Sequence, residues 1–190
     1  MLFKLINIII LLSISYSLPV FSREISDVNI PETISSQASN TELKLNGAGI
    51  RSKFFFDIYI GSLYLETKVS TLEEIDKLTG EKSIRMHFLY SEVSKEKLNN
   101  GWLDGFENNL SKDTYEQLQP RIKLFNSFFT SVKKGDTINL NFIPNKGTQV
   151  VINEKLSGVV EGDDFFPALL KIWLGSEPAD SDLKQAMLGN

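Results

Sequence analysis

Apolar residues recur at every second position in several segments of the chain, which is the pattern of β-strands with one buried face. Residues 83–90 place Ile84, Met86 and Phe88 on one side of such a strand. Three later segments with turns between them (137–143, 148–153 and 155–160) predict antiparallel hairpins. A longer aromatic and β-branched run covers 54–66, and we expect a short strand at 43–45 to end in a glycine turn at 46–49.

Other segments repeat their apolar residues at the spacing of one helix face. One predicted helix begins near Ser94, and a second stripe runs from 118 to 132, with Pro120 in its first turn or at a kink. A third helix follows an expected N-cap at Asp163, and shorter helices cover 71–78 and 181–188. Strands and helices therefore come in groups. This order predicts an α+β fold, an antiparallel sheet with helices layered on one face.

The N-terminus has the three-part layout of a secretory signal peptide. Lys4 precedes an apolar run over 5–14, and small residues stand at Val20 and Ser22, where a signal peptidase would read them. The run is shorter than the roughly 20 residues that a membrane span needs. We therefore expect a periplasmic or secreted protein with no stable membrane span after processing. The alternative is a retained N-terminal anchor.

The polarity of the chain changes twice after this start, and the changes predict three parts. Residues 1–22 are the expected signal peptide. Residues 23–40 are polar and lack periodicity, which predicts a flexible leader. Residues 41–190 carry the periodic segments and are long enough for one domain with a full core.

Composition and charge exclude several classes of function. The chain has no Cys, which removes disulfides, thiolate nucleophiles and Cys-ligated metals, and a single His87 cannot build a usual transition-metal site. A net charge of -4 without a basic stripe argues against nucleic acid. The pair Gly47 and Gly49 lacks the third glycine and the following helix of a dinucleotide fingerprint, so we expect no cofactor.

Arg51 is the residue whose position most suggests binding. It lies between the predicted glycine turn and the aromatic run 54–56, so its side chain can point into apolar surroundings. A buried guanidinium without a partner is costly. The partner is either an internal carboxylate, with Asp57 or a neighbouring Glu as candidates, or an anionic ligand that Arg grips through two hydrogen bonds.

Several segments, in order along the chain, resemble the bacterial chalcone isomerase-like domain. The first two are residues 45–51 and 54–65, which include Gly47-Ala48-Gly49-Ile50-Arg51 and Phe54-Phe55-Phe56-Asp57. The others are Lys134-Gly135-Asp136, then Gly162-Asp163-Asp164-Phe165, and then Ile172-Trp173-Leu174-Gly175-Ser176-Glu177-Pro178. The likeness covers residues from about 43 to 189, and the order of the motifs makes it specific.

The resemblance implies an open-faced β-sandwich with a cleft between the sheet and the helices, which holds flavonoids in the plant enzymes and fatty acids in related plant proteins. It places Arg51 at the position of the arginine that grips the anionic group of the ligand. Tyr59 stands where the enzymes have a Thr, and Asn100 or its neighbour Asn99 matches their helix Asn. The Tyr that the enzymes place at the start of that helix is missing near Ser94.

These departures argue against chalcone isomerisation. We therefore expect a non-catalytic, exported protein that binds a small amphipathic or lipid-like anion, such as a fatty acid, through Arg51, Tyr59 and Asn100. One alternative is an isomerase of the intramolecular-lyase type. The other is a structural or interaction protein whose cleft is filled by its own Phe side chains.

Overall fold

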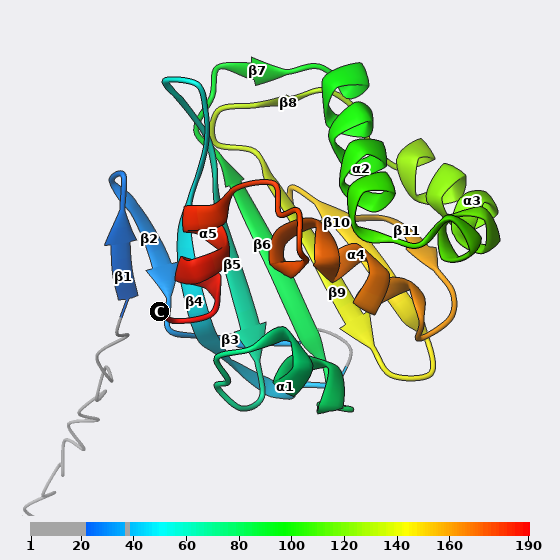
Figure 1. Ribbon diagram of the computed structural model, residues 1–190. Helices are drawn as coiled ribbons and strands as arrows, with labels where there is room; N and C mark the ends of the chain where they lie inside the picture. Colours follow the sequence, from blue (N-terminus) through cyan, green and yellow to red (C-terminus); the bar gives the residue numbers. More distant parts are fainter. Residues whose placement is uncertain (1–21, 37–38) are drawn as a thin grey trace, which may run out of the picture.

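A seven-stranded antiparallel sheet forms the centre of the computed structural model, which describes residues 22–36 and 39–190 (Figure 1). Across the sheet the strands lie in the order β11, β10, β9, β6, β5, β4, β3. Their bounds are β3 (Thr33–Ser35), β4 (Glu42–Lys53), β5 (Phe56–Leu65), β6 (Lys82–Phe88), β9 (Thr137–Ile143), β10 (Gly147–Ile152) and β11 (Lys155–Val160). Two small pairs complete the strands, β1 (Ser22–Ile25) with β2 (Val28–Pro31) and β7 (Glu92–Val93) with β8 (Val132–Lys133).

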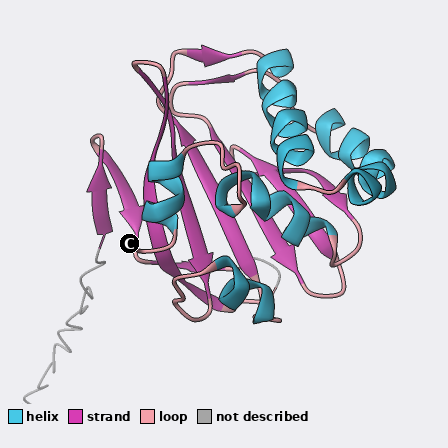
Figure 2. Ribbon diagram, in the orientation of Figure 1, coloured by secondary structure: helices cyan, strands magenta, loops and turns pink. Residues whose placement is uncertain are grey.

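Helices cover one face of this sheet (Figure 2). Their bounds are α1 (Leu72–Lys77), α2 (Lys95–Asn109), α3 (Lys112–Ser127), α4 (Phe165–Leu174) and α5 (Ser181–Met187). The side chains of Ser94, Ser111 and Asp180 accept hydrogen bonds from the first turns of α2, α3 and α5, which fixes where these helices begin. The predicted α+β class, with helices layered on one face of an antiparallel sheet, is confirmed.

The two faces of the sheet bury different sets of side chains, because alternate residues of a strand point in opposite directions. On the helix side, Leu63 of β5 and Leu140 of β9 join a core with the stripes of α2, α3 and α4. On the other side, Ile60 and Tyr64 of β5 belong to a smaller cluster with Ile30 of β2 and with β3. The β1–β2 hairpin and β3 thus cover only part of the second face.

The segment 23–40, predicted as a flexible leader, differs from that prediction where the structure describes it. Residues 22–36 form β1, β2 and β3, and β3 pairs with β4 at the edge of the main sheet. The apolar residues Ile30 and Ile34 are buried there, although polar neighbours conceal them in the sequence. The expected signal peptide lies outside the described residues, except for Ser22. Within 22–36 and 39–190, no helix is long and apolar enough to cross a membrane.

The predicted glycine turn at 46–49 is wrong, because β4 continues through these residues to Lys53. The glycines instead allow α5 to lie directly on the strand. A Cβ on Gly49 would stand 2.6 Å from the Cβ of Ala186 in α5, and a Cβ on Gly47 would collide with the Ala186 carbonyl oxygen. Glycine is needed here for close approach of a helix rather than for a turn.

The chain turns later, at the aromatic run that was expected to be part of a strand. Phe54 has a φ of 58° and lies with Phe55 at the tip of the β4–β5 hairpin, where their side chains are 86% and 99% exposed. Two helix predictions also need correction. Pro120 lies inside α3 rather than in its first turn, and Asp163 accepts hydrogen bonds from the backbone N of Asn145 rather than capping α4.

Candidate functional site

Arg51 and Tyr59 lie directly opposite each other on β4 and β5, on the face that the helices cover. Cross-strand partners of this kind point to the same side of a sheet. The Cζ atom of Arg51 lies 5.7 Å from the centre of the Tyr59 ring, within the range of a cation–π contact. The structure therefore brings together two of the three residues predicted to bind a ligand.

The Tyr59 hydroxyl is held in the interior by an indole. The Nε1–H of Trp173 in α4 donates a hydrogen bond to this oxygen over 2.9 Å. Burial raises the pKa of Tyr59, and the nearby positive charge of Arg51 opposes that rise. The phenol therefore stays neutral at physiological pH, where it can take part in hydrogen bonds but cannot act as a base.

Arg51 does not have the internal partner that the sequence suggested. Asp57 accepts a hydrogen bond from the Ser52 hydroxyl over 2.8 Å, and within the described residues Arg51 forms no ion pair. Asp180, the N-cap of α5, lies close by, since its Oδ2 accepts a hydrogen bond from the backbone N of Ser52. Its charge also contributes to the raised pKa of Tyr59. Arg51, a partly buried residue, thus forms no ion pair with any carboxylate of the described residues.

The third predicted residue lies apart from this pair. Asn100 is exposed on α2, whereas its neighbour Asn99 is partly buried and its Oδ1 has no hydrogen-bond partner in the described part of the chain. Of Asn99 and Asn100, Asn99 is therefore the one that faces inward. Asn109, at the C-terminal end of α2, joins this helix to the segment after α4 by hydrogen bonds with the backbone of Glu177.

Sequence reasoning misses Trp173 and Asp180 as neighbours of Arg51 and Tyr59. Trp173 is 114 residues from Tyr59 in the chain, and an apolar helix stripe gives no sign of which strand residue its indole will meet. Asp180 is the N-cap of α5, and this role explains an aspartate at the start of a helix without any contact with Arg51. Only the docking of α4 and α5 on the sheet places them here.

The interior beside Tyr59 is filled by side chains. Tyr59 is 5% exposed, and its ring lies 5.6 Å from that of Phe88. The Trp173 ring lies 5.7 Å from that of Trp102, and Leu183 of α5 packs over Gly61. The arrangement thus offers a cation at the edge of a closed aromatic interior. It can hold an anion at that edge, and an apolar tail would need side chains or α5 to move.

Comparison with known proteins gives a family and a fold. A family model described as chalcone isomerase-like matches residues 22–189. The solved structure of a fatty-acid binding protein from Arabidopsis thaliana (AtFAP1) superimposes with a TM-score of 0.61 at 17% sequence identity, covering 83% of this chain and 96% of that one. At this identity the likeness concerns the fold, and it confirms the chalcone isomerase-like architecture. No curated protein matches the sequence.

Proposed function

From the premise that this chain belongs to the chalcone isomerase-like family, we propose that it is an exported, non-catalytic binding protein for a small amphipathic anion such as a fatty acid. The observation that carries the proposal is Arg51, a half-buried cation against the Tyr59 ring that forms no ion pair within the described residues. The carboxylate of the ligand completes this site. The fatty-acid binding of the plant neighbour is consistent with such a ligand.

The electrostatics of Arg51 favour an anion at this point. A guanidinium without a counter-charge gains charge-assisted hydrogen bonds when a carboxylate binds beside it. The fork of N–H donors matches the two oxygens of a carboxylate. The nearby negative charge of Asp180 opposes the binding of a second anionic group.

Room for the apolar tail comes from α5. This helix has seven residues and packs closely on Gly47, Gly49 and Gly61, so an opening has to break the contacts that hold it on the sheet. Its shift away from β4 exposes apolar surface next to Arg51 while the sheet stays in place. Binding of a tail therefore involves an opening of the C-terminal helix.

The filled interior favours a second candidate, a structural or interaction protein that takes no ligand on the helix side. Tyr59, Phe88, Trp102 and Trp173 already supply the contacts that a tail would make. In that case Arg51 serves the fold through its contact with the Tyr59 ring. The two candidates differ in what the loss of Arg51 changes.

The deciding experiment measures two quantities on the same variants, the affinity for decanoate and the midpoint of thermal unfolding. We expect Arg51→Ala to weaken binding roughly ten- to a hundredfold, since a charge-assisted contact is lost, with little change in unfolding. Arg51→Lys recovers part of the affinity because it keeps the charge but not the fork. Lys53→Ala, which removes an exposed cation two residues away, is the matched control and leaves both quantities unchanged.

The opposite pattern supports the structural candidate. A melting temperature lowered by several degrees in Arg51→Ala, with no decanoate affinity in the unaltered protein, would end the anion-binding proposal. Turnover of a 2′-hydroxychalcone that depends on Arg51 would replace it with the isomerase alternative.

Export is tested separately. The charged start, the apolar run over 5–14 and the small residues before Arg23 support cleavage after Ser22, and with it a periplasmic or secreted location. N-terminal sequencing of the protein from its native host is expected to begin at Arg23. A chain that begins at Met1 and stays with the membrane fraction would instead indicate a retained anchor.

A further inference from the structure

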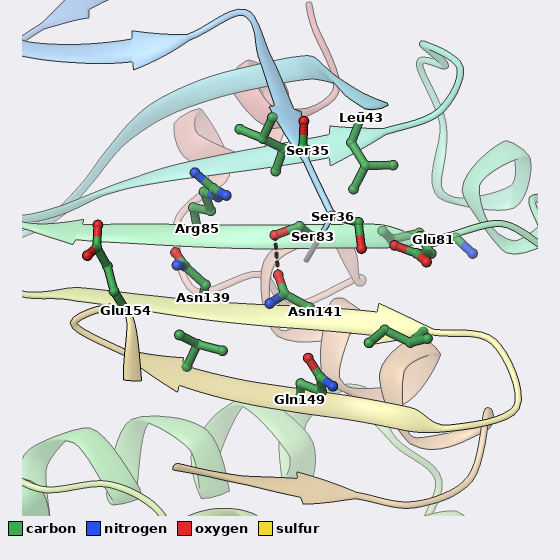
Figure 3. Close-up of a pocket in the computed structure, with 14 residues that line it drawn as sticks. Ser35, Ser36, Leu43, Glu81, Ser83, Arg85, Asn139, Asn141, Gln149 and Glu154 are labelled. Atoms are coloured by element: carbon green, nitrogen blue, oxygen red, sulfur yellow. Dashed lines mark hydrogen bonds between the residues drawn. The ribbon is translucent and has the colours of Figure 1, made fainter. Parts of the chain in front are cut away.

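A polar groove lies on the opposite face of the sheet, away from the helices and from Arg51. It consists of two pockets of about 380 Å³ and 190 Å³. The larger pocket lies between β3 and the exposed surface of β6, β9 and β10 (Figure 3). The smaller pocket lies beside β2. Arg85, Asn139 and Glu154 line both pockets, so the two adjoin at Arg85.

Arg85 is a partly buried cation without an anionic partner. Within the described residues, its buried Nε has no hydrogen-bond partner and Arg85 forms no ion pair. Its guanidinium lies over the Tyr64 ring, with Cζ 5.4 Å from the ring centre. Burial lowers the pKa of Arg85, which means that its charge is poorly hydrated in this position. A cation–π contact offsets part of that cost and leaves the N–H donors unused.

The neighbours of Arg85 on this face are neutral hydrogen-bonding groups. Ser62 of β5 and Asn139 of β9 lie directly across from it on the two adjacent strands. Further along the groove, the Ser83 hydroxyl donates a hydrogen bond to Asn141 Oδ1 over 2.7 Å (Figure 3). Amide and hydroxyl side chains of this kind bind hydroxylated molecules rather than alkyl tails.

The charge balance of the groove sets the charge of its ligand. Glu81 and Glu154 are the carboxylates of the lining, and Lys82 directs its ammonium to the carbonyl oxygens of Leu78 and Gly80 instead of into the groove. Arg85 is the available cation of the lining and can pair with one carboxylate of a ligand, whereas Glu81 and Glu154 disfavour any further negative charge. A phosphate dianion would meet more repulsion than attraction.

We propose that this groove is a second binding site, for a small hydroxylated carboxylate of the sugar-acid class. Arg85 holds the carboxylate, and Asn139, Ser83 and Asn141 form hydrogen bonds with the hydroxyl groups. The volume of the larger pocket suits a ligand of this size. The same chemistry is found in a free sugar acid and in the uronic acid units of a polysaccharide. The site is independent of the function proposed for Arg51.

The test follows the Nε–H resonance of Arg85 by NMR while the purified protein is titrated with D-glucuronate. We expect glucuronate to shift this resonance and the side-chain NH₂ signal of Asn139. D-glucose, which lacks the carboxylate, is expected to leave the Arg85 signal in place, and glucose 6-phosphate to bind more weakly than glucuronate. A trigalacturonate that binds more tightly than glucuronate identifies a polysaccharide as the source, and equal binding identifies the free acid.

Two variants and one control assign the effect to Arg85. Arg85→Gln is expected to lower glucuronate affinity about tenfold or more, because a charge-assisted contact is lost. Asn139→Asp places a carboxylate directly across from Arg85, so it should abolish binding and raise the melting temperature. Arg23→Gln removes an exposed arginine from β1 and is expected to change neither the glucuronate affinity nor the melting temperature.

The proposal fails if glucuronate does not shift the Arg85 resonance, whatever the variants do to stability. It also fails if Asn139→Asp binds glucuronate as tightly as the unaltered protein. If the unaltered protein binds no glucuronate and Asn139→Asp only raises the melting temperature, Arg85 is merely an unpaired cation of the fold.

Discussion

Two tyrosines of β5 illustrate how the fold treats opposite faces of one strand. Tyr59 points to the helices and Tyr64 to the open face, and each carries an arginine against its ring, Arg51 and Arg85 respectively. Burial raises the pKa of both hydroxyls. Each hydroxyl has a hydrogen-bond partner, Trp173 for Tyr59 and the Pro31 carbonyl for Tyr64. At the scale of residues, the two candidate sites are similar pairs of cation and phenol.

The Tyr59–Trp173 hydrogen bond should contribute measurably to stability. Tyr59→Phe leaves the indole N–H of Trp173 buried without an acceptor, which costs about 1–3 kcal/mol of unfolding free energy. Urea unfolding followed by tryptophan fluorescence measures the loss. Tyr115→Phe is the control, because its hydroxyl donates to Glu107 at the surface and its removal should cost less. Equal losses in the two variants would contradict the prediction.

Tyr64 should make the protein less stable in alkali. Its pKa is raised to about 12 in the folded state, against 10.0 for a free side chain. Between these values the unfolded chain loses the proton first, so the stability present below pH 10 declines as pH rises towards 12. Urea unfolding at about pH 9 and about pH 11 should show a smaller decline in Tyr64→Phe than in the unaltered protein. An equal decline in both proteins would disprove the assignment.

At the scale of elements, the contact between α5 and β4 determines how the C-terminus closes the helix side. Gly47 and Gly49 let the helix backbone approach the strand, and Asn46 Nδ2 donates a hydrogen bond to the Met187 carbonyl over 2.8 Å. Asp180 caps the helix at its other end and also binds the backbone N of Ser52 in β4. A short helix with little stability of its own is thus fixed at both ends by the sheet.

Substitution of two glycines by alanine should have opposite effects. Gly49→Ala forces α5 away from β4, because its Cβ would stand 2.6 Å from that of Ala186, and we expect a loss of about 1–3 kcal/mol. Gly101→Ala adds a Cβ that meets nothing within 4 Å in helix α2 and should stabilise by roughly 0.5–1 kcal/mol. Differential scanning calorimetry of the two variants measures whether each one is less or more stable than the unaltered protein. A neutral Gly49→Ala would show that α5 is not tightly held.

At the scale of the whole molecule, one sheet separates two candidate sites. The helix side is apolar and closed around Tyr59, whereas the open face carries the polar groove around Arg85. The sheet is paired continuously from β11 to β3, and its backbone separates the side chains of the two faces. On the two proposals, an amphipathic and a hydroxylated anion would therefore bind on opposite faces of one sheet.

The two sites should respond independently to mutation. Arg85→Gln is expected to change decanoate affinity less than about twofold, and Arg51→Ala to change glucuronate affinity as little, since distant sites with no shared partner act additively. Titration of each variant with each ligand by calorimetry measures the four affinities. A variant that weakens both ligands would indicate a single shared site or a general loss of structure.

The periodicity of the sequence predicts most elements because it records burial directly. The strand at 83–90, the hairpins from 137 to 160 and the helix from Ser94 all appear near their expected places. Strands β1 to β3 do not follow from the sequence, since single buried residues such as Ile30 in polar surroundings produce no periodic signal. The glycines at 47 and 49 resemble a turn in the sequence, and only the contact with α5 explains them.

By itself, the sequence determined the α+β class, the absence of cysteine chemistry and the family resemblance, and it predicted Arg51 and Tyr59 as binding residues, because composition, periodicity and motifs are local properties. The tertiary structure decided which side chains contact these residues. It placed Trp173 on Tyr59, assigned Asp57 to Ser52 instead of Arg51, and left Asn100 on the outside of α2. These outcomes depend on the docking of helices on a sheet, and side chains far apart in the chain meet only when that packing is complete.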